Sequence, residues 1–154
     1  MLGIGDMDKN RNKERTIDNV LNGKCILLAE DNALVAEIEK ELLEFSGASV
    51  EIAENGERAV ARVFNYYTGY YDLVLLDIHL GGYLDGYQTA KEIRQVPWAS
   101  MENVPIIGVL EYDYEQERDK DERGNRVLNA YCKKPLDILE LKTILYEHEL
   151  EQRK

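Results

Sequence analysis

The sequence predicts a doubly wound α/β domain, in which helices cover both faces of one parallel sheet. Short apolar runs of strand length alternate with longer stretches whose apolar residues recur at helical spacing. Three of the short runs are almost entirely apolar, as strands covered on both faces of a parallel sheet are. The β-α unit repeats five times, and right-handed crossovers distribute such helices over both faces of the sheet.

Each element follows from its own run of residues. The expected strands are the five short apolar runs, Lys24 to Ala29, Ser49 to Ala53, Asp72 to Leu76, Val104 to Leu110 and Ala130 to Lys133. Between the strands, apolar residues three or four positions apart mark one face of each helix. In chain order these faces contain Leu34, Ile38, Leu42 and Phe45, then Ala59, Val60, Val63 and Phe64, then Tyr87, Ala90 and Ile93, and finally Ile138, Leu141, Leu145 and His148.

Two segments lack a clear periodic pattern. Residues 1–22 are polar with mixed charges, and we expect a flexible N-terminal arm there, with the domain spanning residues 23–154. From Glu111 to Arg126 tyrosines are the only large apolar residues, so the fourth helix is expected to be short or irregular. That charge run indicates either a solvated surface or a binding surface.

The composition limits the classes of partner. A chain of 154 residues has room for one domain. Its 30 Asp and Glu outnumber 19 Lys and Arg, and the net charge of −11 argues against direct binding to nucleic acid or to an anionic membrane surface. No apolar run approaches the roughly 20 residues of a membrane helix, and the first residues lack the apolar core of a signal peptide. We therefore expect a cytoplasmic protein.

Charged residues follow several of the expected strands. Ligands of open parallel sheets bind beyond the carboxyl ends of the strands, where Glu30, Asp31, Asp77 and Lys134 all fall. Clustered carboxylates repel one another unless a positive charge lies among them, and Mg²⁺ is a cation that such oxygen ligands suit. The pattern predicts a Mg²⁺ site with Lys134 as a second positive charge. A phosphoryl group arriving there can be attacked by the Asp77 carboxylate, which forms an acyl phosphate.

Taken singly, these features have simpler interpretations. The acidic pair is also typical of a helix N-cap, with Asp31 or Asn32 as the capping residue, and Asp77 alone could be a turn residue. Two enzyme classes fit poorly. A haloacid-dehalogenase-type phosphatase needs a second aspartate where His79 stands, and the acidic residues after the first strand would repel a flavin phosphate. The shared edge favours a signalling phosphoacceptor rather than an enzyme.

With these motifs established, the stretch from Lys24 to about Glu149 resembles the receiver domain of two-component response regulators, the CheY-like phosphoacceptor module. The likeness rests on CILLAEDNALVAEIEKELLEFSG, DLVLLDIHL followed by DGYQTAKEIR, VPIIGVL and AYCKKPLD. It implies a flavodoxin-like sheet in the order 2-1-3-4-5. It also implies a sensor histidine kinase or phosphotransfer protein as phosphodonor, and a downstream protein target. Without a DNA-binding segment after Lys154, a stand-alone regulator and a receiver cut from a longer protein are both open.

The resemblance also implies a role for each residue of the acidic edge. Asp77 corresponds to the phosphorylated aspartate. Asp31 corresponds to a direct Mg²⁺ ligand, Glu30 to a residue that holds the ion through water, and the backbone carbonyl of His79 to a further ligand. Lys134 corresponds to the lysine that pairs with the phosphoryl group.

The sequence departs from the family pattern at the end of the fourth strand. Leu110 replaces the usual Ser or Thr, so the hydroxyl that hydrogen-bonds the phosphoryl group is missing. Glu111 replaces a small residue and adds negative charge nearby. Tyr131 corresponds to the aromatic switch residue, although a half-buried strand-edge ring is the simpler interpretation. We expect phosphorylation of Asp77 with atypical switching. The alternative is a pseudo-receiver, an interaction module not switched by phosphorylation.

The loop after Asp77 differs as well. Gly81 replaces a proline, and glycine relaxes the backbone, so this loop is expected to be more mobile. His79 stands two residues beyond the nucleophile. It could tune the lifetime of the acyl phosphate or be an exposed bystander.

Overall fold

Five parallel strands form one sheet in the order β2-β1-β3-β4-β5, as predicted. The computed structural model describes residues 16–66, 70–99, 104–111 and 126–152. The strands are β1 (Cys25–Ala29), β2 (Ser49–Ala53), β3 (Leu73–Asp77), β4 (Ile106–Leu110) and β5 (Ala130–Lys133). β3 ends one residue later than the apolar run, because Asp77 still pairs with Val109 of β4. The predicted phosphoacceptor is therefore the last residue of a central strand.

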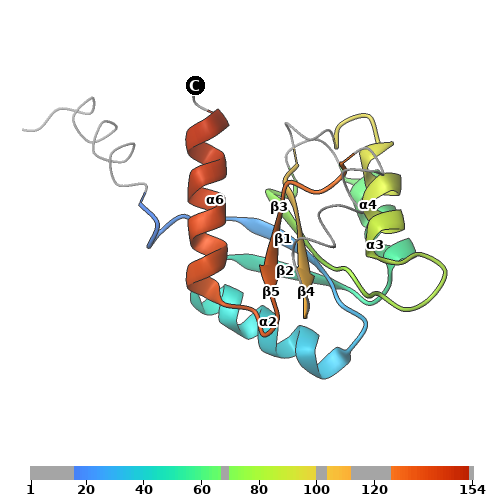
Figure 1. The fold of residues 1–154 in the computed structure, drawn as a ribbon, viewed down its shortest axis with the longest axis horizontal. Helices are drawn as coiled ribbons and strands as arrows, with labels where there is room; N and C mark the ends of the chain where they lie inside the picture. The colour runs from blue at the N-terminus through green and yellow to red at the C-terminus, as the bar shows by residue number, and fades with distance from the viewer. Residues whose placement is uncertain (1–15, 67–69, 100–103, 112–125, 153–154) are drawn as a thin grey trace, which may run out of the picture.

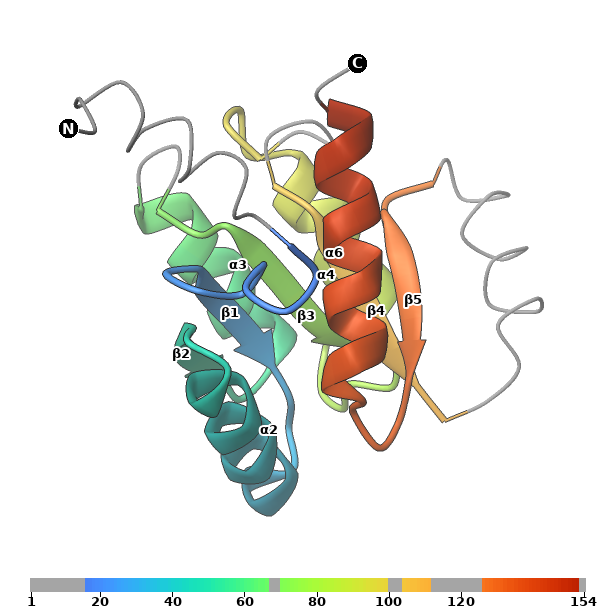
Figure 2. The same cartoon turned by 90° about the vertical axis from the view of Figure 1, so that its left-hand side faces the viewer.

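Helices cover both faces of this sheet, which confirms the doubly wound architecture. The described helices are α2 (Ala33–Phe45), α3 (Gly56–Asn65), α4 (Gly86–Arg94) and α6 (Ile138–Gln152). Figures 1 and 2 show α2 and α6 on one face and α3 and α4 on the other. In the described part of the chain, no helix has the length and apolar character needed to cross a membrane. The expected short fourth helix falls mainly in residues 112–125, outside the described residues.

Alternating strand residues supply two separate cores. On the side of α3 and α4, Leu76 and Leu110 pack with Ile93. On the side of α2 and α6, Leu75 packs in a cluster that includes Leu43. The strands place apolar side chains on both faces, because successive residues of a strand point to opposite sides.

Short polar side chains begin the helices next to the acidic edge. Asn32, and not Asp31, caps α2, since its side chain accepts a hydrogen bond from the backbone N–H of Val35 at 3.1 Å. Asp85 caps α4 through a reciprocal hydrogen-bonding pair with Gln88. The helix is therefore capped by Asn32, the residue after the acidic pair, and the Asp31 carboxylate remains available to the site.

The first turn of α4 packs directly against the end of β3. A Cβ atom at Gly86 would lie 2.5 Å from the Cα of Ile78 and 2.6 Å from the carbonyl oxygen of Asp77. The Gly86 N–H donates to the Ile78 carbonyl at 3.0 Å. Only glycine allows this close approach, which holds the backbone around Asp77 in place.

The apolar face expected on the first helix of the domain is the face that points outward. Leu34, Ile38, Leu42 and Phe45 are all exposed. The face packed on the sheet carries instead the smaller set Ala36, Glu39 and Leu43. The periodicity identified an apolar stripe correctly but did not indicate which side of α2 the sheet covers.

The described core begins upstream of residue 23, where we expected the domain to start. Of the predicted arm, the structure describes residues 16–22. Val20 and Leu21 are fully buried in the cluster beneath α2 and α6. The Gly23 N–H also donates to the Gly47 carbonyl at 2.9 Å, which ties this segment to the turn before β2.

Candidate functional site

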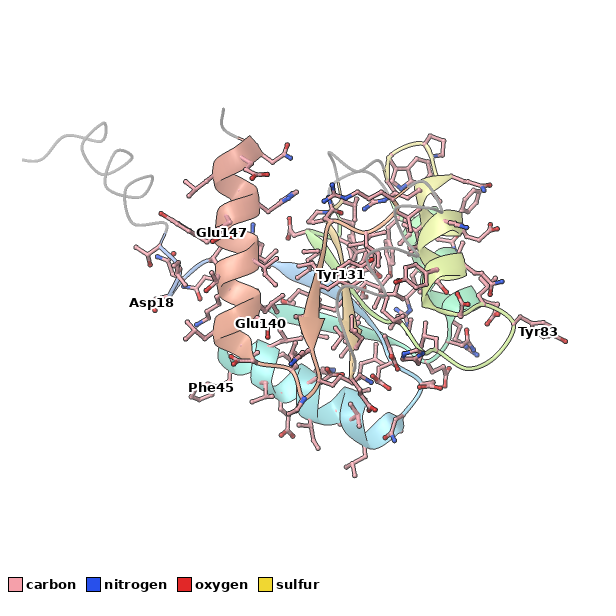
Figure 3. All side chains as sticks on the ribbon, in the orientation of Figure 1. Asp18, Phe45, Tyr83, Tyr131, Glu140 and Glu147 are labelled. Carbon is pink, nitrogen blue, oxygen red and sulfur yellow. The ribbon has the colours of Figure 1, made fainter. Side chains whose placement is uncertain are left out.

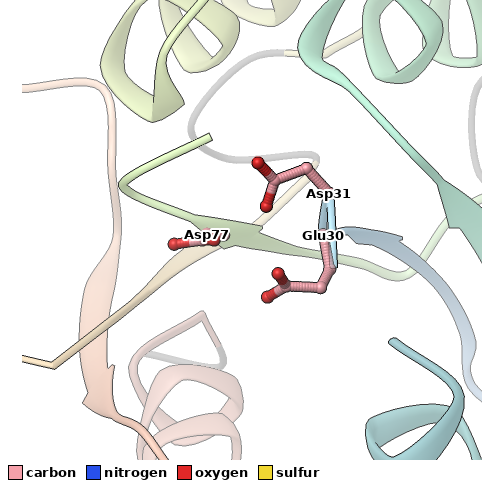
Figure 4. A group of neighbouring side chains, drawn as sticks. All are labelled: Glu30, Asp31 and Asp77. Carbon is pink, nitrogen blue, oxygen red and sulfur yellow. The ribbon is translucent and has the colours of Figure 1, made fainter. Parts of the chain in front are cut away.

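Three carboxylates meet at the carboxyl edge of the sheet, where the sequence predicted them. Glu30 and Asp31 follow β1, and Asp77 ends β3. One carboxylate oxygen from each lies within 4.8 Å of the other two. Figure 4 shows the three side chains pointing to the same side of the strand ends.

Lys134 completes this cluster from the segment after β5. Its Nζ lies 2.8 Å from Oε2 of Glu30 and 3.2 Å from Oδ2 of Asp77. Burial alone favours a neutral amine, but the hydrogen bond to Glu30 and the charges of both carboxylates outweigh it and raise the pKa of Lys134. The side chain is therefore held as an ammonium ion between two acids.

One ammonium does not fully compensate two buried carboxylates. Glu30 is only 2% exposed, and besides Lys134 it accepts the backbone N–H of Asn32 at 3.1 Å. Burial and the nearby charge of Asp77 nevertheless raise its pKa, against the effect of the hydrogen bond from Lys134. A further cation at this edge would relieve the repulsion.

Asp77 is held in place by the backbone around it. The residue is 6% exposed, and its Oδ1 accepts the backbone N–H of His79 at 3.0 Å. The His79 residue itself is exposed. A pocket of about 280 Å³ opens at Asp77, and its lining includes Glu30, Asp31, His79, Glu111 and Lys134. Asp77 thus faces a space lined by the other charged residues predicted for the site and by His79.

Asp31 is the exposed member of the cluster, and the loop after β3 holds it. Its Oδ2 accepts the backbone N–H of Gly81 at 3.1 Å. A proline at this position, as the family pattern has it, could not donate that hydrogen bond. The replacement by glycine that the sequence revealed therefore adds a contact between the loop and a predicted metal ligand.

The residues expected to govern switching lie around the end of β4. Leu110 is fully buried in the apolar cluster beneath α3 and α4 and offers no hydroxyl to the site. Glu111 is exposed and lines the pocket at Asp77. Tyr131 is half-buried, packs against the same cluster as Leu110, and has its hydroxyl 3.5 Å from that of Tyr87 on α4.

The donor set at this edge fits a small hard cation. Mg²⁺ prefers carboxylate and water oxygens and retains several waters, which one exposed and two buried carboxylates around an open pocket allow. The residues that would hold it are Glu30, Asp31 and Asp77. The backbone carbonyl of His79 stays a prediction.

Two positions near the site went unnoticed in the sequence. The N–H of Gly81 is a backbone group, and no side-chain pattern reports its contact. Glu39 lies within the first predicted helix of the domain. It stands three residues after Ala36 and four before Leu43, on the face that packs against the sheet. The sequence carried no signal for the burial of Glu39, because the more apolar stripe of this helix predicts a different face as the covered one.

Comparison with known proteins identifies the family. The model of the response regulator receiver domain matches residues 26–146, so the chain belongs to this family of two-component signalling domains. Among curated relatives, it is 38% identical over 82 residues to a transcriptional regulatory protein CpxR homolog of Haemophilus influenzae. It is 33% identical over 82 residues to a gliding motility regulatory protein of Myxococcus xanthus. Each match covers 53% of this chain, and 32% and 10% of those longer proteins, respectively.

Solved structures give the same answer. The chain matches a CheY-like receiver domain protein from Methanospirillum hungatei with a TM-score of 0.68 and 26% identity, over 84% of this chain and 99% of that one. It matches the receiver domain of a sensor histidine kinase from Pseudomonas aeruginosa with a TM-score of 0.67 and 30% identity, over 81% and 96% of the two chains. That second structure has a magnesium ion coordinated in its active-site cleft.

Proposed function

We propose that this receiver domain accepts a phosphoryl group on Asp77 in a reaction that requires Mg²⁺. The observation that supports this most directly is the position of the Lys134 ammonium, within 3.2 Å of the Asp77 carboxylate and 2.8 Å of Glu30. A cation held at the nucleophile offsets the repulsion that an incoming phosphate meets from the carboxylates.

The proposed transfer balances without another co-reactant. An oxygen of the Asp77 carboxylate attacks the phosphorus of a phosphohistidine, a P–O bond forms, and the P–N bond of the donor breaks. The electron pair of the broken bond stays on the imidazole nitrogen of the donor. Lys134 pairs with the phosphoryl oxygens, and the Mg²⁺ supplies charge neutralisation when it is bound. The protein acts here as an acceptor, and we propose no enzymatic activity for it beyond this step.

The family indicates the classes of partner but not the individual partner proteins. Receiver domains work with histidine kinases or phosphotransfer proteins, and we infer that one of these is the phosphodonor, with a downstream protein as the target. The acidic net charge of −11 supports protein partners rather than direct nucleic-acid or membrane contact. The cytoplasmic location stays a prediction.

Phosphorylation is tested with a small phosphodonor. The full chain is incubated with Mg²⁺ and acetyl phosphate, and intact mass is measured. We expect a gain of one phosphoryl group in the wild type, no gain in Asp77→Asn, and no gain when EDTA removes the metal. Asp72→Asn is a matched control, because Asp72 lies just before the opposite end of β3, where its side chain accepts the backbone N–H of Cys25. Absence of a mass gain in the wild type would overturn the proposal.

Leu110 favours a second candidate, the pseudo-receiver that binds partners without being switched. Its buried hydrocarbon side chain cannot donate the hydrogen bond that usually draws the next loop toward the phosphoryl group. Beryllofluoride with Mg²⁺ separates the two functions by amide NMR. Shifts that reach Tyr131 and Tyr87 support a switch. Shifts confined to residues around Asp77 support the pseudo-receiver.

A further inference from the structure

The loop that joins β3 to α4 contacts the acidic site from one side. It runs from Ile78 to Asp85. Ile78 and Leu80 are buried in the apolar cluster beneath α3 and α4, whereas the residues from Gly81 to Tyr83 are exposed. Figure 3 shows Tyr83 projecting away from the body of the domain. The apolar core therefore holds the first part of this loop but not its middle.

Two successive glycines occupy the exposed part of the loop. Gly82 has a φ of 103°, in the left-handed region that favours glycine. Glycine leaves the backbone more conformational freedom than other residues do, so polar contacts are needed to hold such a segment in one conformation. One of these contacts is the hydrogen bond from the Gly81 N–H to Oδ2 of Asp31. The orientation of this exposed predicted metal ligand thus depends on a glycine-rich loop.

Glu57 holds the far end of the same loop. It is the second residue of α3, and its Oε1 accepts the backbone N–H of Leu84 at 3.0 Å. Both residues are half-buried, and the acceptor is a carboxylate, which makes this hydrogen bond stronger than one between neutral groups. The contact ties the loop to α3, a helix that contributes no side chain to the acidic cluster.

Close packing beside Glu57 supports this contact. A Cβ atom at Gly56 would lie 2.8 Å from the Cβ of Leu84 and 2.1 Å from Oγ1 of Thr89. Only glycine allows the first turn of α3 to come this close to the loop and to α4. Thr89 is fully buried, and its hydroxyl donates to the Asp85 carbonyl at 2.7 Å. The end of the loop therefore rests on the packed first turns of two helices.

We propose that Glu57 is a positioning residue for the metal site: by holding Leu84, it keeps the loop where the Gly81 N–H orients the Asp31 carboxylate. Gly82 and Tyr83 alone separate the two hydrogen-bonded residues of the loop. Without the Glu57 contact the loop samples more conformations, and the hydrogen bond to Asp31 forms for a smaller fraction of the time. The inference rests on the proposed Mg²⁺-dependent function.

A carboxylate in the first turn of α3 also has a simpler role. It interacts favourably with the positive end of the helix dipole, and this role requires no contact with the loop. It predicts that Glu57→Ala and Glu57→Gln both lower the free energy of unfolding, since both remove the charge. The proposed positioning role differs, because the amide oxygen of glutamine can still accept the Leu84 N–H.

The test is a titration of the full chain with Mg²⁺, followed by amide NMR. We expect Glu57→Ala to weaken Mg²⁺ binding about threefold, since groups that orient a ligand tune metal affinity. Glu57→Gln should bind Mg²⁺ as the wild type does. Glu54→Ala is the matched control for charge, because Glu54 is an exposed residue three positions earlier whose carboxylate pairs with Arg58. Its affinity for Mg²⁺ should also equal that of the wild type.

A second measurement needs no metal. Hydrogen exchange of the Gly81 amide should be about threefold faster in Glu57→Ala than in the wild type, because the hydrogen bond to Asp31 opens more often. In Glu57→Gln the exchange rate should stay at the wild-type value. A role limited to the helix dipole would leave the Gly81 amide unchanged in both variants.

Three results would overturn the proposal. These are equal Mg²⁺ affinity in the wild type and Glu57→Ala, equal losses of affinity in Glu57→Ala and Glu57→Gln, and an unchanged exchange rate of the Gly81 amide in Glu57→Ala. Equal losses in the two variants would assign the effect to the charge of Glu57. If the wild type binds no Mg²⁺, the proposed function fails, and the exchange rate of Gly81 still decides whether Glu57 holds the loop.

Discussion

Glu30 and Glu39 are buried to nearly the same extent, yet their surroundings differ. Glu30 accepts hydrogen bonds from Lys134 and from the backbone of Asn32. Glu39 has one carboxyl oxygen without any partner among the described residues. The first has two hydrogen-bond donors and one neighbouring positive charge, whereas the second lies in mainly apolar surroundings. The comparison indicates that the surroundings of a carboxyl group, and not its depth of burial, decide whether its hydrogen-bonding capacity is satisfied.

Of the changes considered, removing the positive charge of Lys134 should have the largest effect on stability. In Lys134→Ala, Glu30 and Asp77 lose the ammonium between them, and breaking a buried ion pair typically costs about 3 to 5 kcal/mol. We expect the free energy of unfolding, measured in urea at pH 7.5 without Mg²⁺, to fall by an amount toward the lower end of this range. Added Mg²⁺ should restore part of the lost stability. Lys133→Ala, at an exposed neighbouring position, should lose less than about 1 kcal/mol. Equal losses in the two variants would contradict the assigned role of Lys134.

Replacing Glu39 should instead increase the free energy of unfolding. Burial, and then the charge of Glu30, raise the pKa of Glu39 from 4.5 to about 7. Between these pH values the unfolded chain ionises first, so the wild type loses stability as pH rises, and the loss is complete above pH 7. We expect Glu39→Leu to be more stable than the wild type by about 2 to 3 kcal/mol at pH 8, and this difference to disappear below pH 4.5.

The control for this prediction lies on the same helix. Glu41 is exposed, and Glu41→Leu should show no comparable dependence of the stability difference on pH. Urea unfolding from pH 4 to pH 8 measures both variants. A Glu39→Leu variant that is less stable than the wild type at pH 8 would mean that the carboxyl group has a stabilising partner. A gain in stability would instead agree with an unfavourable burial of the ionised carboxyl group.

The smallest effect is expected at the exposed edge of the acidic site. In Gly81→Ala the new Cβ would lie 3.1 Å from Oδ2 of Asp31, so the carboxylate must shift by a few tenths of an ångström. We expect Mg²⁺ affinity to fall by about three- to tenfold, because groups that orient a ligand tune metal binding. Calorimetric titration with Mg²⁺ measures the change. Unchanged affinity would show that the loop does not position Asp31.

The sequence was sufficient for the sheet and for most of the site. The sequence predicts that Glu30, Asp77 and Lys134 lie close together, because each follows or ends an apolar strand and parallel strands end at the same edge of a sheet. The hydrogen bond from Gly81 could not be predicted, since it comes from the backbone of a loop. The orientation of α2 could not be predicted either. Its more apolar face, with Ile38 and Leu42, points outward, and only tertiary packing decides which face the sheet covers.

The burial of Val20 and Leu21 has a practical consequence for anyone who shortens or fuses this domain. A truncation just before Lys24 would remove two fully buried side chains and leave voids beneath α2 and α6. Large-to-small changes in such places cost about 2 to 5 kcal/mol each. A minimal domain should therefore keep residues from at least Thr16 onward, where the Thr16 N–H also donates to Asn19. A fluorescent or affinity tag is best joined upstream of that point.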